Sequence, residues 1–139
     1  MQRLVDQWRE SGMTIQSGVG TEAISRFESE RDLLLPEDLR RYFQTINGTG
    51  QVMDNNLLRF WLFEEVQPVA FVSAEICPDC YVFADYCIDC WHYAIELTRD
   101  NSKGGAVFEV TGGSPPRTLI ATSFREFIHL YLTDPTQVV

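Results

Sequence analysis

The spacing of the hydrophobic residues changes twice along this chain, and no other feature restricts the possible folds as strongly. Up to Asn47 the apolar side chains recur every three or four residues, which is typical of helices. From Arg59 to Ala121 they occur in short runs separated by polar, Gly-containing turns, which is typical of β-strands. A helical spacing returns after Ser123. Helices, then strands, then one helix predict an α+β domain.

Three helices are expected before the strands. The first covers residues 3–10 and stops at Ser11-Gly12, and the second begins at about Thr21, after Gly20. The third is the most clearly marked, because Pro36 suits a first helical turn and is followed by two acidic residues and an apolar stripe. Asn47-Gly48 is expected to end it.

The middle of the chain is expected to form an antiparallel sheet of about five or six strands. The short Cys87–Cys90 connection indicates a hairpin between two of them. After the strands, Ser123 and Glu126 have the spacing of a capping box and begin a last helix, which Asp134-Pro135 ends. We expect the helices to cover one face of the sheet. The predicted strands are residues 59–63, 81–86, 91–97, 106–110 and 117–121.

The size and hydropathy of the chain predict one domain, residues 1–139. It has a mass of 16.0 kDa, with 45% hydrophobic and 22% charged residues, which is enough apolar surface to form a core. No apolar run approaches the roughly 20 residues that a membrane helix needs, and Met1–Trp8 lacks the pattern of a secretion signal. A soluble, cytoplasmic protein without membrane contact is therefore expected.

The charge of the chain argues against nucleic acid as a partner. Twenty acidic and 11 basic residues give a net charge of −9, which repels phosphate backbones. The stretch Phe60–Thr98 contains seven carboxylates and no Lys or Arg. These acids either keep the protein soluble as ordinary solvated groups or form a docking face for a basic protein.

Four cysteines in two CxxC pairs form the only candidate metal site. Cys77, Cys80, Cys87 and Cys90 match the ligand count of a structural zinc site. However, the six-residue gap is shorter than the roughly 15 to 20 residues of zinc ribbons, and a strand across it would hold the pairs up to about 20 Å apart. The alternative is free, reduced cysteines. Disulfides are not expected in a reducing compartment, and redox catalysis is not expected because a strand follows Cys80.

No catalytic pattern is present, so an enzyme is not expected, and no cofactor is implied. The two histidines, His92 and His129, lie in no metal-binding motif. Nucleophile elbows, phosphate loops and dinucleotide fingerprints are absent from the sequence. The aromatic residues of the strand region could serve an interface but are expected to form core. They are Phe60, Trp61, Phe63, Trp91 and Tyr93.

The order of several short motifs resembles the SUKH superfamily, the Smi/Knr type of small α+β domain. The segment from Leu35-Pro36 to Asn47-Gly48 is similar to the family's "LP … NG" signature, and Phe60-Trp61-Leu62 with Glu64-Glu65-Val66 is similar to its "fW-l-eei" strand and exit. Further similarity lies at Ile24 with Phe27-Glu28, at Phe83-Ala84-Asp85 and Tyr93-Ala94-Ile95, and at Ser123-Phe124 with Phe127. Together these motifs cover residues 21–133.

The resemblance implies a non-enzymatic protein-binding module. Bacterial members are widely immunity proteins that neutralise toxins, many of them nucleases with basic clefts, and fungal relatives regulate cell-wall synthesis and signalling. We therefore expect a basic toxin domain as partner and Glu64, Glu65, Asp85 and Asp89 as its binding patch. A regulatory scaffold and a zinc-stabilised module are the alternatives. The family pattern does not include the four cysteines, and the sequence indicates no oligomeric state.

Overall fold

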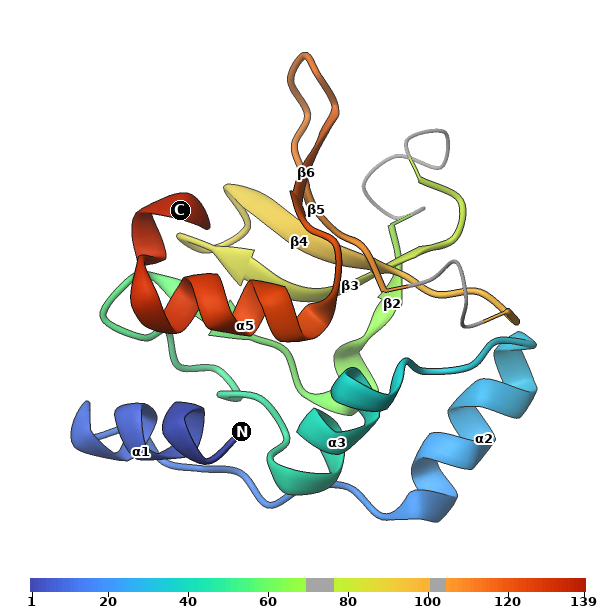
Figure 1. Cartoon of the computed structure of the whole chain (residues 1–139), viewed down its shortest axis with the longest axis horizontal. Coiled ribbons are helices and arrows are strands. Elements are labelled where there is room, and N and C mark those ends of the chain that lie inside the picture. Colours follow the sequence, from blue (N-terminus) through green and yellow to red (C-terminus); the bar gives the residue numbers. More distant parts are fainter. Residues whose placement is uncertain (70–76, 101–104) are drawn as a thin grey trace.

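The helices and strands follow one another in the predicted order. A computed structural model describes residues 1–69, 77–100 and 105–139 (Figure 1). The helical elements are α1 (Gln2–Glu10), α2 (Thr21–Arg31), α3 (Glu37–Thr45), the 3-10 turn η1 (Phe63–Glu65), α5 (Phe124–Thr133) and the 3-10 turn η2 (Pro135–Gln137). The strands are β1 (Leu58–Phe60), β2 (Gln67–Pro68), β3 (Cys80–Tyr86), β4 (Trp91–Glu96), β5 (Val107–Val110) and β6 (Arg117–Ala121). The predicted α+β class is confirmed.

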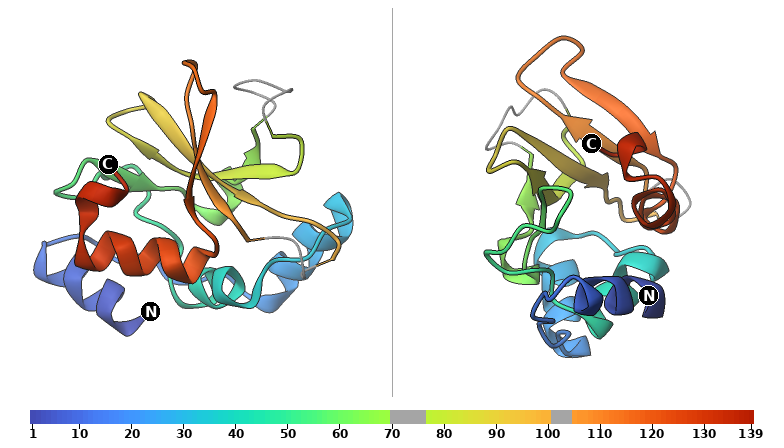
Figure 2. Two further views of the ribbon diagram at one scale, coloured as in Figure 1. Left: turned by 45° about the horizontal axis from the view of Figure 1, so that its top comes forward. Right: turned by 90° about the vertical axis from the view of Figure 1, so that its left-hand side faces the viewer.

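The six strands form one antiparallel sheet. Strands β3 to β6 are consecutive neighbours, so this part is the expected meander, and the predicted hairpin at residues 87–90 joins β3 to β4. The other edge of β3 pairs with β1 near one end and with β2 near the other. Figures 1 and 2 show the helices gathered on one side of the sheet, with the β5–β6 hairpin projecting away from them.

An aromatic core fills the space between the sheet and the helices. Phe60 of β1 and Phe83 of β3 contact Phe127 of α5, with ring centroids 6.3 and 5.3 Å apart. The predicted N-cap of α5 is confirmed, because Ser123 Oγ accepts a hydrogen bond from the Glu126 backbone N–H at 3.1 Å. Within the described ranges, no helix is long and apolar enough to cross a membrane.

The first predicted strand, residues 59–63, is too long at its end. The structure keeps only Leu58–Phe60 in β1, and the chain then turns into η1. The carboxylate of Glu65 explains this change, since it accepts a hydrogen bond from the Leu62 backbone N–H at 2.8 Å and so closes the turn. The aromatic sequence favours a strand, but this local hydrogen bond outweighs that preference.

A chain of buried polar groups connects the two ends of the protein. Trp8 Nε1 of α1 donates a hydrogen bond to the Tyr131 hydroxyl of α5 at 2.8 Å, and that hydroxyl donates to the carboxylate of Asp54. Asp54 also accepts from the backbone N–H groups of Asn56 and Leu58. The Tyr131 hydroxyl therefore joins both terminal helices to the loop that leads into β1.

Tyr131→Phe should destabilise the protein, because it leaves the buried Trp8 N–H without its acceptor and Asp54 without one donor. An unsatisfied buried polar group costs about 1–3 kcal/mol, so the thermal midpoint should fall by several degrees. Differential scanning calorimetry measures this change. Tyr81→Phe is the matched control and should leave the midpoint nearly unchanged, since Tyr81 is only partly buried. Equal midpoints for the two variants would contradict the assignment.

Candidate functional site

A row of polar side chains crosses the face of the sheet opposite to the one on which the described helices pack. Arg59 of β1 lies directly opposite Asp85 of β3, which lies opposite His92 of β4. The chain neighbours of all three residues point into the helix-side core. Because successive side chains of a strand point to opposite faces, Arg59, Asp85 and His92 share the other face, here called the open face.

A buried ion pair forms the centre of this row. Arg59 Nε lies 2.8 Å from Asp85 Oδ2, and the Asp85 side chain is only 1% exposed. Trp61 Nε1 donates to the same carboxylate oxygen, and the guanidinium carbon lies 5.2 Å from the Trp61 ring centroid. Burial alone would lower the pKa of Arg59, but the hydrogen bonds and charges of Asp85 and Glu65 raise it. Arg59 therefore stays positively charged under all physiological conditions.

Further carboxylates surround Arg59. Glu65 lies 3.1 Å from Arg59 Nη1 and also accepts a hydrogen bond from Gln51. Asp89, whose side chain is 65% exposed, lies 3.2 Å from His92 Nε2. Glu64 is exposed and accepts a hydrogen bond from Asn47. The local charge at the surface is thus negative, although a cation lies at its centre.

Two cavities open on either side of Arg59. The first, of about 600 Å³, is lined by Arg31, Trp61, Glu64, Glu65 and Asp89 among others. The second, of about 280 Å³, is lined by Gln51, Met53, Asp85, Ile88 and Asp89 as well as Arg59. Both are mixtures of polar and apolar side chains at the surface. This geometry suits contact with the side chains of another macromolecule.

The structure brings the four predicted acids together around Arg59, but it does not place all of them at the surface. Glu64 and Asp89 are exposed, whereas Glu65 is largely committed to Arg59 and to η1. The expectation that Asp85 lies on a docking surface is wrong, because its carboxylate is buried and paired with Arg59. Asp85 can act on a partner only by holding other residues in place.

Arg59 is the site residue that sequence analysis missed. Arg59 immediately precedes Phe60, the first residue of the stretch without Lys or Arg. The available signal was a lone arginine inside the run Leu57–Phe63, where an unpaired cation would be costly to bury. A partner carboxylate on a neighbouring strand was therefore to be expected.

The cysteines do not form the four-ligand zinc site that the sequence left open. The first pair lies at the start of β3 and the second just beyond its end, so the six strand residues 81–86, about 20 Å of extended chain, separate them. Among residues 1–69, 77–100 and 105–139, no group of three or more His, Cys, Asp or Glu is placed to hold a metal ion. The extended conformation of β3 therefore keeps the two cysteine pairs too far apart to bind one metal ion.

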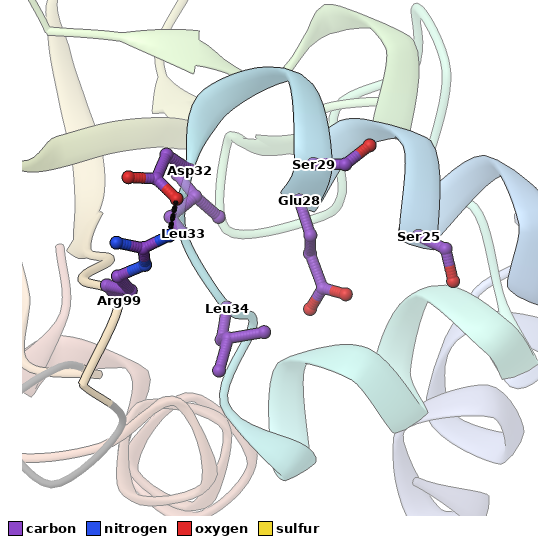
Figure 3. Close-up of a pocket in the computed structure, with 7 residues that line it drawn as sticks. All are labelled: Ser25, Glu28, Ser29, Asp32, Leu33, Leu34 and Arg99. Carbon is purple, nitrogen blue, oxygen red and sulfur yellow. Dashed lines mark ion pairs between the residues drawn. The ribbon is translucent and has the colours of Figure 1, made fainter.

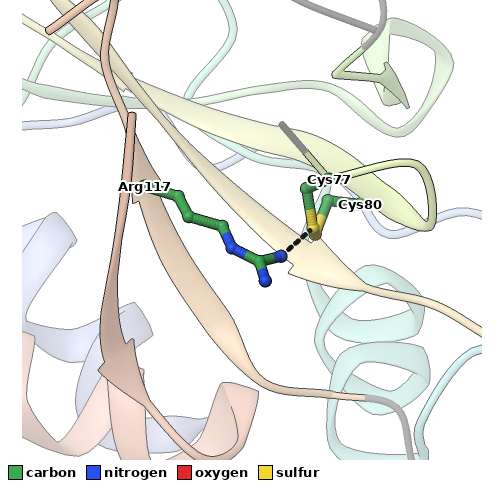
Figure 4. Close-up of a disulfide and its surroundings, with 3 residues drawn as sticks. All are labelled: Cys77, Cys80 and Arg117. Atoms are coloured by element: carbon green, nitrogen blue, oxygen red, sulfur yellow. Dashed lines mark hydrogen bonds between the residues drawn. A yellow bond between two sulfur atoms is a disulfide. The ribbon is translucent and has the colours of Figure 1, made fainter. Parts of the chain in front are cut away.

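Cys77 and Cys80 are joined by a disulfide, contrary to the expectation of free thiols (Figure 4). Both are buried in a small apolar cluster on the open face. Arg117 Nη1 lies 3.2 Å from Cys77 Sγ, and its guanidinium carbon lies 5.0 Å from the Phe108 ring centroid. The backbone N–H of Cys80 also donates to the Cys77 carbonyl at 3.1 Å. This turn brings together two residues that the sequence places three positions apart.

A separate cavity of about 360 Å³ lies at the end of α2 (Figure 3). Its buried carboxylate, Glu28, accepts a hydrogen bond from the Leu35 backbone N–H at 2.8 Å and pairs with Arg40 of α3. Its exposed ion pair joins Asp32 to Arg99 at 2.7 Å. These polar groups hold the connection between α2 and α3, so this cavity is the weaker candidate for a functional site.

Comparison with known protein families identifies the fold. The model of the SMI1 / KNR4 family (SUKH-1) matches residues 18–129. The chain belongs to this family. The matched range includes α2, the whole sheet and the residues around Arg59. A search of curated proteins found no match. Membership of the SMI1/KNR4 family supports an immunity or regulatory module, and it confirms the resemblance seen in the sequence.

Asp85→Asn should destabilise this SMI1/KNR4 domain, because it removes the charge of the buried carboxylate that pairs with the partly buried Arg59. Loss of one partner of a buried pair costs about 3 kcal/mol, so the midpoint of urea unfolding should fall clearly. Asp89→Asn makes the same chemical change at an exposed position and should have little effect. Equal unfolding midpoints would show that the Arg59–Asp85 pair does not stabilise the fold.

Thiol labelling tests the arrangement of the cysteines. In the folded, non-reduced protein, iodoacetamide should label only Cys87 and Cys90, and Cys77 and Cys80 should react only after unfolding and reduction. Hydrogen bonding to Cys87 raises the pKa of the Cys90 thiol, so its labelling should be slow at neutral pH and faster at higher pH. Peptide mass spectrometry assigns each site. Rapid labelling of all four thiols without reduction would contradict the disulfide.

Proposed function

We propose that this protein is an immunity protein that binds and neutralises a basic effector protein through its open face. The observation that carries the proposal is the exposed, fixed carboxylates of Glu64 and Asp89 around the buried Arg59–Asp85 pair. Membership of the SMI1/KNR4 family supports the general class of function. The effector remains defined by its chemistry, a protein with a positively charged working surface.

The acids are held in place before any partner binds. The Asn47 side-chain amide donates a hydrogen bond to Glu64 at 3.2 Å, and Asn47 Oδ1 accepts one from the Phe63 backbone N–H at 2.6 Å. On the other side of Arg59, His92 contacts Asp89 at 3.2 Å. Side chains that are already ordered lose less conformational entropy on binding. Fixed carboxylates thus favour a tight and specific contact with a basic surface.

The charge of the whole chain supports the same mode of binding. A net charge of −9 attracts a positively charged partner and increases the rate of encounter. The same negative charge disfavours binding to nucleic acid. The protein would therefore block its effector by covering the effector's positively charged surface. No chemical step by the immunity protein is required.

Co-expression with the product of the neighbouring gene tests the proposal. If that product is a toxin, the immunity protein should restore growth and should co-purify with it as a complex. A regulatory scaffold, the alternative function expected for this family, would bind other proteins without restoring growth. Absence of both rescue and complex formation with a toxic neighbour would eliminate the immunity function.

Charge reversal at the open face should slow binding without unfolding the protein. For Glu64→Lys/Asp89→Lys, we expect the association rate to fall by about tenfold or more at low salt and to depend less on ionic strength. Stopped-flow fluorescence with the purified effector measures this rate. The matched control is Asp6→Lys/Glu10→Lys on α1, which changes the net charge equally at exposed positions away from the sheet. Similar rates for the two variants would remove the acidic patch from the interface.

A further inference from the structure

The tip of the β3–β4 hairpin has an unusual backbone. Cys87, Ile88 and Asp89 have φ angles of 50°, 57° and 60°, so three consecutive residues other than glycine adopt the left-handed conformation. This conformation is unfavourable for side chains with a Cβ, and most of all for a β-branched residue such as Ile88. Glycine or asparagine would fit all three positions better.

The strain at the tip is not compensated by burial. Ile88 is 75% exposed, the largest exposed fraction among the large hydrophobic residues that the structure describes. Leu57, immediately before β1, repeats the pattern with a φ of 64° and an exposed fraction of 42%. The backbone N–H of Cys87 donates to the Leu57 carbonyl at 2.9 Å, so the two strained segments are adjacent. The fold thus holds two apolar residues in solvent at a cost in free energy.

Hydrogen bonds fix the tip to the open face. The Asp89 backbone N–H approaches Asp85 Oδ1 at 3.4 Å, and the Asp89 side chain contacts His92 at 3.2 Å. The Cys90 backbone N–H donates to the Tyr86 carbonyl at 3.0 Å. Ile88 and Asp89 also line the 280 Å³ cavity beside Arg59. The apolar tip and the acidic surface are therefore one continuous region, joined by hydrogen bonds.

We infer that Ile88 and Leu57 are the apolar anchors of the interface, and that they enter an apolar pocket rimmed by Lys or Arg on the partner protein. The inference rests on the proposed function. Interfaces usually combine a few buried apolar anchors with a polar rim, and strained, exposed residues are typical of binding surfaces. The carboxylate of Asp89, next to Ile88, requires a basic rim on the partner.

A second copy of this chain is a poor candidate for that partner. A symmetric contact through the tip would bring Asp89 and the acids around Arg59 of both copies together, and like charges at an interface repel. The net charge of −9 adds to this repulsion. A basic protein pocket satisfies both the apolar and the charged groups of the tip.

Ile88→Asn separates the anchor role from a purely structural role, because asparagine tolerates the left-handed conformation but cannot fill an apolar pocket. We expect the thermal midpoint to rise or stay unchanged, while the affinity for the purified product of the neighbouring gene falls at least about tenfold, mainly through faster dissociation. Leu119→Asn is the matched control, since Leu119 is 55% exposed on β6, and its affinity should equal that of the wild type. Surface plasmon resonance and scanning calorimetry provide the two measurements.

The outcomes distinguish this inference from the proposed function. If the wild-type protein does not bind the neighbouring product, the proposed function fails and the anchor assignment fails with it. If the wild type binds and both Ile88→Asn and Leu57→Asn bind equally well, the anchors are wrong and the function stands. If the wild type forms a dimer that Ile88→Asn dissociates, the occupant of the tip is a second copy, which overturns the assignment to a basic partner.

Discussion

The buried ion pair between Arg59 and Asp85 is the contact on which the open face depends. Two charges taken out of water gain little unless each is fully hydrogen-bonded. Asp85 meets this condition, because it receives Arg59 and the Trp61 indole N–H and lies beside the Asp89 backbone N–H. One carboxylate therefore ties together edge strand β1, the chain leading into η1 and the β3–β4 tip. Among the described residues no helix packs on this face, and the polar network lies beside the small apolar cluster that contains Trp61.

A single irregularity in β3 sends Asp85 to this face. The β3–β4 register shifts between Val82 and Ala84, and both Phe83 and Ala84 belong to the helix-side core. Without the shift, strict alternation from Val82 would place Asp85 on the helix side, where the core is aromatic. The extra residue reverses the alternation and turns the carboxylate towards Arg59. The bulge thus determines where the charged row forms.

Local sequence signals predicted most elements of the fold but little of the site. The last strand, Arg117–Ala121, and the helix begun by Ser123 agree with the structure, because turn residues and caps mark them in the chain itself. The burial of Asp85 depends on cross-strand pairing and on the bulge, neither of which has a local signal. The disulfide likewise depends on a turn within Cys77–Cys80 that brings the thiols together. The acids were recognisable as a group, but their division into buried and exposed members was not.

The open face contains two features that cost folding free energy: the Arg59–Asp85 ion pair and the left-handed turn at the β3–β4 tip. Buried ion pairs can often be replaced by hydrophobic residues without loss of stability, and an isoleucine in a left-handed turn can be replaced by asparagine with a gain. Here both features are present, and Asp85 and Asp89 connect them. Departures of this kind persist where function outweighs stability. On the helix side of the sheet, the polar groups of Tyr131 and Asp54 are joined in hydrogen bonds within an aromatic core, whereas the buried Tyr42 hydroxyl has no hydrogen-bond partner there among the described residues. Selection for binding, as proposed above for the open face, would keep the ion pair and the left-handed turn in place despite their cost in stability.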